Sequence, residues 1–194
     1  MIDVEEARAS HGPALVALFR AAGCGCFCRY WHFTGTKNDW LARLAETPDA
    51  GAAELTGALD RGAPDGRGLV ALDRERGEAV GWLKLCALAE VPKLRVQGAY
   101  RGLDLEAGGA PLAIGCLLVH PSSRRSGVAG ALLAGAVARA QAEGVVLLGF
   151  PRRSAAPLYD EAAFAGPERA FEAAGFRVAH DSPAYPVYRF NPRE

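Results

Sequence analysis

The strongest pattern of hydrophobic positions lies in the second half of the chain. Residues 112–119 form an almost continuous apolar run, which predicts a strand buried on both faces. After a polar turn, apolar residues recur at helical spacing from Val128 to Gly144, and residues 145–150 form a second apolar run. This succession predicts a strand–helix–strand unit whose two strands are parallel and joined by a right-handed crossover.

The rest of the chain predicts shorter elements separated by turns. They are a strand over 2–6, a helix between Ser10 as its N-cap and Gly23, a helix capped by Asn38, a helix over 50–59, a hairpin of strands 68–73 and 78–88, a helix over 161–174, and strands over 176–179 and 187–190. Residues 89–111 show no clear period and predict a long loop, a feature that is often functional in compact domains.

Composition places the chain among globular proteins. Its 194 residues suit one domain over 1–194, and half of them are apolar. The longest uncharged run, residues 107–123, is too short and too broken by proline and glycine to span a bilayer. The acidic first residues lack the basic and apolar order of a signal peptide, so we expect a cytoplasmic protein whose five cysteines are reduced.

Charge is unevenly spread along the chain. The formal net charge is zero, which argues against a protein that coats nucleic acid or an anionic membrane. Residues 107–159 nevertheless carry five arginines and one glutamate, a net charge of +4 that the rest of the chain balances with −4. A cationic segment in a neutral protein predicts one anionic ligand bound at one place.

The turn inside the strand–helix–strand unit has the chemistry of an anion site. The backbone N–H groups of residues 127–130 begin the helix without partners inside it, at the positive end of the helix dipole. Arg124 and Arg125 stand just before them. Because the two strands are parallel, Arg152 and Arg153 should emerge at the same edge of the sheet. A pyrophosphate would suit this site.

Two common phosphate-binding motifs do not fit this turn: the segment has no lysine for a Walker A loop, and a proline and two serines interrupt a dinucleotide fingerprint. Residues 119–129, Val-His-Pro-Ser-Ser-Arg-Arg-Ser-Gly-Val-Ala, instead resemble the V-x-P-x-x-R-x-x-G-x-G/A motif of the GNAT N-acetyltransferases, with Ala129 in the last small position. The order of the predicted elements and an Ala-Gly-Phe at 174–176 extend the resemblance over most of the chain. A Gly-Trp pair at 81–82 and a Cys-x-Cys stretch before Trp31 resemble a bacterial subgroup of this family.

The resemblance implies a fold and an activity. The fold would be α/β, with a mixed, mostly antiparallel central sheet, one splayed pair of parallel strands and helices on both faces. The activity would be that of an acetyl-CoA-dependent N-acetyltransferase, in which a primary amine of a small molecule or a protein attacks the thioester directly. Acetyl-CoA would be the cosubstrate and no metal would be needed. A homodimer is compatible with this interpretation.

The resemblance also implies which residues bind acetyl-CoA. Backbone groups of Leu117, Leu118 and Val119 would hydrogen-bond the pantetheine arm like a missing strand. The residues expected to hold the pyrophosphate are Arg124, Arg125, Ser126, Gly127, Val128, Ala129 and Gly130.

The chain departs from the family at the acceptor end. Many members carry a tyrosine acid in the late helix and an asparagine one helix span earlier, where this chain has Phe171 and Phe164. Tyr159 is the nearest replacement for the acid, and His120 is a candidate base. Alternatively, the CoA thiolate leaves without a dedicated acid, or the protein binds acyl-CoA without catalysis.

Three cysteines within residues 24–28 precede an aromatic stretch. In a GNAT arrangement this segment borders the acceptor pocket, so Cys26, Tyr30 and Trp31 are candidate substrate-binding residues. A zinc site with His32 is a weaker interpretation, because alternate positions of an extended segment cannot easily surround one ion. A thiol or metal sensor, and buried cysteines that act as small apolar residues, stay open as alternatives.

Overall fold

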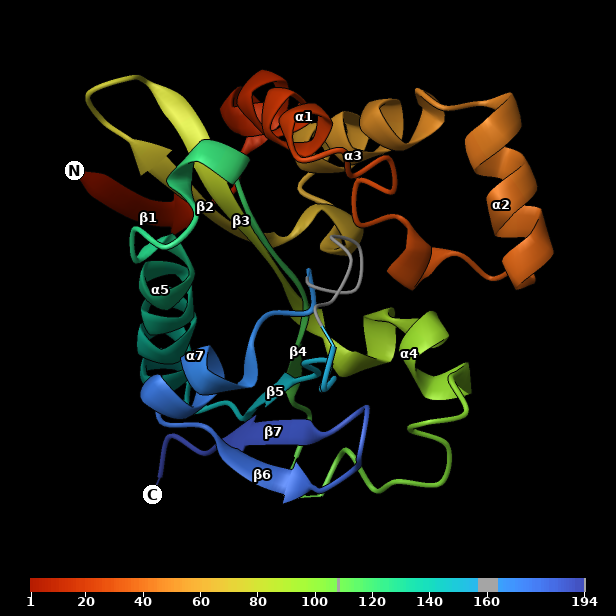
Figure 1. The fold of residues 1–194 in the computed structure, drawn as a ribbon, viewed down its shortest axis with the longest axis vertical. Helices are drawn as coiled ribbons and strands as arrows, with labels where there is room; N and C mark the ends of the chain where they lie inside the picture. Colours follow the sequence, from red (N-terminus) through yellow and green to blue (C-terminus); the bar gives the residue numbers. More distant parts are fainter. Residues whose placement is uncertain (108, 157–163, 194) are drawn as a thin grey trace.

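A seven-stranded sheet forms the centre of the computed structural model, which describes residues 1–107, 109–156 and 164–193 (Figure 1). Its strands are β1 (Ile2–Glu6), β2 (Gly68–Asp73), β3 (Glu78–Ala87), β4 (Leu112–Val119), β5 (Leu147–Gly149), β6 (Arg177–His180) and β7 (Val187–Phe190). The order across the sheet is β1-β2-β3-β4-β5-β7-β6, and β4 and β5 are the one parallel pair among these described strands. The predicted mixed, mostly antiparallel sheet is confirmed.

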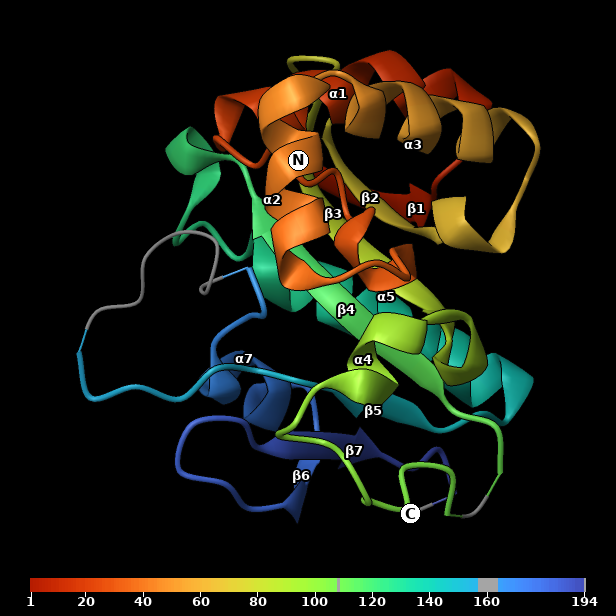
Figure 2. The same cartoon turned by 90° about the vertical axis from the view of Figure 1, so that its right-hand side faces the viewer.

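Helices cover both faces of this sheet. They are α1 (Gly12–Ala21), α2 (Lys37–Glu46), α3 (Ala50–Asp60), α4 (Pro92–Val96), α5 (Val128–Glu143) and α7 (Glu168–Ala173). Figures 1 and 2 show α1 and α3 at one end of the molecule, over one face, and α5 and α7 against the other face. None of the described helices is long and apolar enough to cross a membrane.

The strand β4 contributes to the apolar core on both faces, because successive side chains of a strand point in opposite directions. Leu118 is fully buried in the cluster that contains Leu15 of α1 and Leu55 of α3. Leu117 belongs to the cluster that contains Leu132 of α5. Burial of each such leucine stabilises the fold by roughly 1.5–3 kcal/mol, so this alternation holds β4 at the centre of the molecule.

The parallel pair separates toward the carboxyl end of β4. Its pairing with β5 runs from Leu112 opposite Leu147 to Ile114 opposite Gly149, while β4 itself continues to Val119. The strand β5 is shorter than predicted, three residues rather than six. Beyond Ile114, no described strand pairs with the edge of β4 that faces β5.

Three helix starts differ from the sequence prediction. His11, not Ser10, is the N-cap of α1, because a short 3-10 turn precedes the helix. Thr36, not Asn38, caps α2, since its hydroxyl accepts the Asp39 N–H at 3.2 Å while the Asp39 carboxylate accepts the Thr36 N–H at 2.8 Å.

The late helix predicted over 161–174 begins only at Glu168. Gly166 has a φ of +85° and Pro167 is the N-cap, so the backbone just before Glu168 is not helical. Residues 161–163 lie outside the described part of the chain.

Candidate functional site

A groove of about 360 Å³ lies between the carboxyl end of β4, the turn that follows it and α7. It is lined by Leu117, Val119, Ser123, Arg124, Arg125, Gly127, Val128, Ala129, Phe164, Pro167, Arg169 and Ala170. Seven of the ten residues that the sequence assigned to acetyl-CoA binding are among them. Leu118, Ser126 and Gly130 are not.

The turn before α5 is held in shape by local hydrogen bonds and by two residues with positive φ. Arg125 has a φ of +62° and Gly127 a φ of +87°. The hydroxyl of Ser126 donates to the Ser123 carbonyl at 2.6 Å, and Nδ1 of His120 accepts the Ser122 N–H at 3.2 Å. The left-handed Gly127 is the N-cap of the 16-residue helix α5, whose first N–H groups have no intrahelical acceptor. The turn thus combines helix-dipole and arginine charge, as an anion site requires.

Backbone groups of β4 face the groove only at alternate residues. The His120 N–H donates to Val80 on the β3 side, and Leu118 lies two positions earlier opposite Trp82, so its backbone groups also point to β3. Those of Leu117 and Val119 point the other way, toward the gap. The Leu117 N–H already donates to the Phe164 carbonyl at 2.7 Å. Leu118 therefore has no backbone group on the groove side of β4. Of the three residues predicted to bind the pantetheine arm, only Leu117 and Val119 present backbone groups there.

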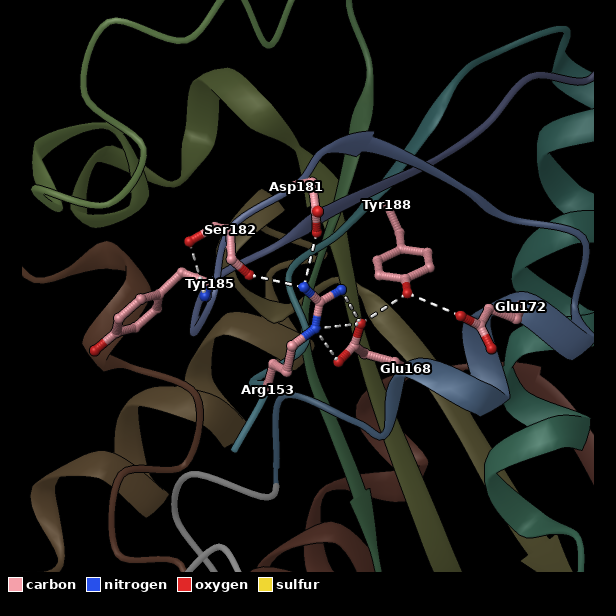
Figure 3. Close-up of polar contacts among 7 residues, drawn as sticks. All are labelled: Arg153, Glu168, Glu172, Asp181, Ser182, Tyr185 and Tyr188. Atoms are coloured by element: carbon pink, nitrogen blue, oxygen red, sulfur yellow. Dashed lines mark hydrogen bonds and ion pairs between the residues drawn. The ribbon is translucent and has the colours of Figure 1, made fainter. Parts of the chain in front are cut away.

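The sequence predicts that Arg152 and Arg153 emerge at the same edge of the sheet as Arg124 and Arg125, but the two pairs have different surroundings in the structure. Arg124 and Arg125 line the groove, but Arg152 and Arg153 do not. Arg153 donates to the carboxylates of Glu168 and Asp181, each at 2.7 Å, as Figure 3 shows. Two carboxylates thus accept the hydrogen bonds of the Arg153 guanidinium. The spacing of residues in the sequence could not show that they pair with Arg153 and not with Arg152.

The Arg153 ion pairs fasten α7 to the hairpin of β6 and β7. Figure 3 shows Arg153, Glu168 and Tyr188 in one cluster, with the Tyr188 hydroxyl 2.8 Å from Glu168 and 3.0 Å from Glu172. Hydrogen bonds from Arg153 hold the pKa of Glu168 below its usual range. Burial, followed by these two carboxylates, raises the pKa of Tyr188 above its usual range. Arg153 is therefore a structural residue.

A second cavity of about 290 Å³ adjoins the groove. Phe164 lines both spaces, and β4 passes from one to the other between Cys116 and Leu117. The lining residues are Cys24, Cys26, Cys28, Tyr30, Trp31, Gln97, Tyr100, Gly115, Cys116, Phe150, Arg152, Phe164, Ala165 and Tyr185. All three residues predicted to contact the acceptor, Cys26, Tyr30 and Trp31, are present in this set.

Gly115 makes room for Trp31 in this cavity. A Cβ at position 115 would lie 3.1 Å from Nε1 of the indole, which is tighter than ordinary van der Waals contact. The close approach brings the segment around Trp31, which follows α1 in the chain, against the central strand. Because this contact joins residues 84 positions apart, the sequence pattern could not predict it.

Two of the cysteines that line this cavity, Cys24 and Cys116, are buried and have raised pKa values. Cys24 and Cys116 are 3% and 5% exposed, and Sγ of Cys24 lies 3.7 Å from Sγ of Cys26. The contact with Cys26, followed by burial, raises the pKa of Cys24, and a hydrogen bond with Cys28 followed by burial raises that of Cys116. Thiols that stay neutral are poor nucleophiles and poor metal ligands. No group of three or more His, Cys, Asp or Glu side chains placed to hold a metal is found among the described residues.

Neither of the two positions considered for a tyrosine acid, 171 and 159, provides a cavity residue in the described part of the chain. Phe171 is fully buried against Phe176, Tyr188 and Gly149, so it belongs to the core and does not line the cavity. Tyr159, the predicted acid, lies outside the described residues.

The structure brings Tyr100, from the predicted long loop 89–111, and Tyr185 into the cavity, and of these two residues the sequence prediction missed Tyr185. Burial raises the pKa of Tyr100 to about 12. The sequence signal for a functional segment after β3 was the absence of a clear hydrophobic period over residues 89–111.

The groove, the splayed parallel pair and the turn before α5 together form a site that suits an extended, pyrophosphate-containing ligand beside β4. The model of the Acetyltransferase (GNAT) family matches residues 37–164. The chain therefore belongs to the GNAT acetyltransferase family.

Solved structures with the same fold cover nearly the whole chain. An N-acetyltransferase from Staphylococcus aureus Mu50 is 15% identical with a TM-score of 0.55, and the alignment covers 99% of each chain. The histone acetyltransferase HPA2 and related acetyltransferase from Corynebacterium glutamicum is 19% identical with a TM-score of 0.58, covering 98% of this chain and 96% of that one. The PaiA N-acetyltransferase from Thermoplasma acidophilum, solved in complex with coenzyme A, is 11% identical with a TM-score of 0.54, covering 98% and 99%. No curated protein sequence matches the chain significantly.

Proposed function

We propose that this protein transfers the acetyl group of acetyl-CoA to a primary amine. One observation supports the proposal: the groove at the start of α5 and the aromatic cavity adjoin at Phe164, beside the part of β4 that does not pair with β5. A long ligand that lies in the groove would present its far end to the cavity. This is the arrangement that a thioester donor and a separate acceptor require.

The chain's residues fit acetyl-CoA as cosubstrate. The N-terminal turn of α5, with Arg124 and Arg125 beside it, would bind the pyrophosphate. Val119 would offer backbone groups to the pantetheine arm. Arg169 on α7, at the opposite side of the groove, would add a third positive charge near the phosphates.

The reaction proposed is direct attack. The amine nitrogen forms a bond to the acetyl carbon, the carbon–sulfur bond breaks, and the electron pair leaves with the CoA sulfur. The proton lost by the amine balances the proton that the thiolate gains. Tyr159 remains the acid proposed from the sequence, and Tyr100, which burial keeps protonated, is the alternative within the described cavity.

A non-catalytic acyl-CoA-binding module is the second candidate. Phe171, where many relatives carry the tyrosine acid, is a buried core residue and donates no proton. Such a module would bind acetyl-CoA and release no CoA with any amine. The one-domain organisation over 1–194, the cytoplasmic location and a homodimer stay predictions.

The decisive experiment measures acetyl-CoA binding by calorimetry and CoA release by a thiol assay with a panel of amines. We expect the double variant Arg124→Ala/Gly127→Glu to bind acetyl-CoA at least about a hundredfold more weakly, because it removes one charge–phosphate contact and places a carboxylate at the site. Arg177→Ala, an exposed arginine on β6, is the matched control and should bind like the wild type. Unchanged affinity in the folded double variant would contradict the groove assignment.

A further inference from the structure

The acceptor cavity is lined by an arginine, Arg152, with a buried hydrogen-bond donor that has no partner among the described residues. Arg152 lines the cavity, and its guanidinium carbon lies 4.0 Å above the centre of the Tyr185 ring. Its Nε is buried and has no hydrogen-bond partner among the described residues. No described carboxylate forms an ion pair with Arg152 either. A buried, unpaired donor of this kind costs free energy unless a ligand satisfies it.

The neighbouring residue, Arg153, differs from Arg152 because carboxylates bind its guanidinium. It is fully occupied by Glu168, Asp181 and the carbonyl of Ser182 (Figure 3). Figure 3 also shows the Tyr185 ring directed away from that cluster. Of two consecutive arginines, one is used by the fold and the other faces the cavity.

The cavity carries positive charge without a compensating acid. None of its described lining residues is an aspartate or glutamate. The thiols of Cys24 and Cys116 contribute no negative charge, since their pKa values are raised. Among the described lining residues, a cationic acceptor such as a polyamine would meet the Arg152 guanidinium and no carboxylate.

We propose, on the basis of the acetyltransferase function above, that the acceptor is an amine that also carries a carboxylate, and that Arg152 binds this carboxylate. A guanidinium presents a planar fork of N–H donors that matches a carboxylate in two parallel hydrogen bonds. Stacking on Tyr185 holds the plane of the fork in place.

The residues that line the cavity and its volume restrict the remaining part of the acceptor molecule. Trp31, Tyr100 and Phe150 provide aromatic surface, and the volume of about 290 Å³ suits a molecule of amino-acid size. The acceptor class is therefore an amino acid with an apolar or aromatic side chain. Its amine would take the acetyl group in the reaction already described, and the carboxylate would remain unchanged.

The test uses acceptors matched in everything but the carboxylate. L-phenylalanine is compared with 2-phenylethylamine, and L-leucine with 3-methylbutylamine, by CoA release at saturating acetyl-CoA. We expect the wild type to favour the carboxylate-bearing member of each pair in kcat/KM by roughly 10- to 100-fold, the range for hydrogen bonds to a charged group. Equal rates, or a preference for the amine without a carboxylate, would overturn the proposal.

The variant Arg152→Met removes the charge and keeps the length of the side chain. It should lose about the same 10- to 100-fold with L-phenylalanine, mainly through KM, and change at least tenfold less with 2-phenylethylamine. Arg152→Lys keeps the charge but not the fork, so its kcat/KM with L-phenylalanine should lie between those of the wild type and Arg152→Met. It replaces Arg152→Met in the test if that variant does not fold. Arg177→Met, on the exposed side of β6, should match the wild type on both substrates. Equal losses on both substrates would contradict the proposal.

A binding measurement separates failure of this inference from failure of the acetyltransferase function. Calorimetric titration of the CoA-loaded protein with N-acetyl-L-phenylalanine requires no turnover. Binding that weakens at least about tenfold in Arg152→Met supports the carboxylate site even if no amine releases CoA. Absent or unchanged binding overturns it even if the enzyme acetylates other amines.

Discussion

Gly127 and Gly130 lie one helical turn apart at the start of α5, yet their backbones differ. Gly127 has a φ of +87°, in the left-handed region that disfavours side chains, while Gly130 sits in the first turn of α5. A Cβ at either position would meet no atom within 4 Å. Backbone conformation alone therefore distinguishes them.

At the residue scale we predict that replacing glycine by alanine lowers the stability of the protein at position 127 but not at position 130. Gly127→Ala should lower the free energy of unfolding by about 1–2 kcal/mol, because alanine is strained in the left-handed conformation. Gly130→Ala should leave it unchanged or raise it by up to about 1 kcal/mol, because alanine favours the helix. Urea unfolding of both variants measures this difference, and a loss of equal size in both would disprove the explanation.

At the scale of elements, β5 and α7 are joined by one close contact. Gly149 of β5 lies directly under the ring of Phe171, and a Cβ there would overlap that ring. Phe171 in turn packs edge-on against Phe176, with ring centres 5.3 Å apart. Phe171, where the family resemblance led us to expect a tyrosine acid, thus supports the sheet in this protein.

We expect Gly149→Ala to cost about 1–3 kcal/mol of stability through overpacking. In the double variant Gly149→Ala/Phe171→Leu the smaller side chain relieves the overlap, so the combined loss should be less than the sum of the single losses by at least about 0.5 kcal/mol. Chemical denaturation of the four proteins tests this coupling. Strict additivity would show that the two elements do not meet as described.

At the scale of the whole molecule, buried charges tie distant parts of the chain together. Lys84 of β3 is fully buried and donates to the Asp65 carbonyl at 2.9 Å, and Arg29 pairs with the Asp65 carboxylate. His32 donates from Nδ1 to the Glu90 carbonyl at 2.8 Å, while its Nε2 is buried without a partner among the described residues. Burial, then the charges of Lys84 and Arg29, lowers the pKa of His32 to about 4.

This shift predicts acid sensitivity of the fold. Between pH 6.5, the ordinary value, and pH 4 the unfolded chain binds a proton that the folded His32 does not, so protonation favours unfolding. The contribution of His32 to stability is complete above pH 6.5 and falls as the pH drops toward 4. Urea midpoints at pH 7 and pH 5 should differ more for the wild type than for His32→Gln. His180→Gln on β6 is the control, and an unchanged pH dependence in His32→Gln would refute the prediction.

The sequence by itself determined the features whose causes are local. The strand Leu112–Val119 and the helix Val128–Glu143 are found within one residue of their predicted limits, and so is the hairpin of β2 and β3. Hydrophobic period, a left-handed glycine and the spacing of the turn act over a few residues, so they can be recognised along the chain. The same local pattern carried the family resemblance and most of the groove residues.

Only the tertiary structure decided which side chains share a cavity and which are neutralised. Arg152 and Arg153 are adjacent and chemically identical, but Asp181 and Glu168 reach only Arg153. The meeting of Cys24 with Cys116, and of Tyr100 with Arg152, depends on strand order and on loops that return to the sheet. These contacts join residues far apart in sequence, and the balance of burial against charge pairing that selects them exists only once the chain is folded.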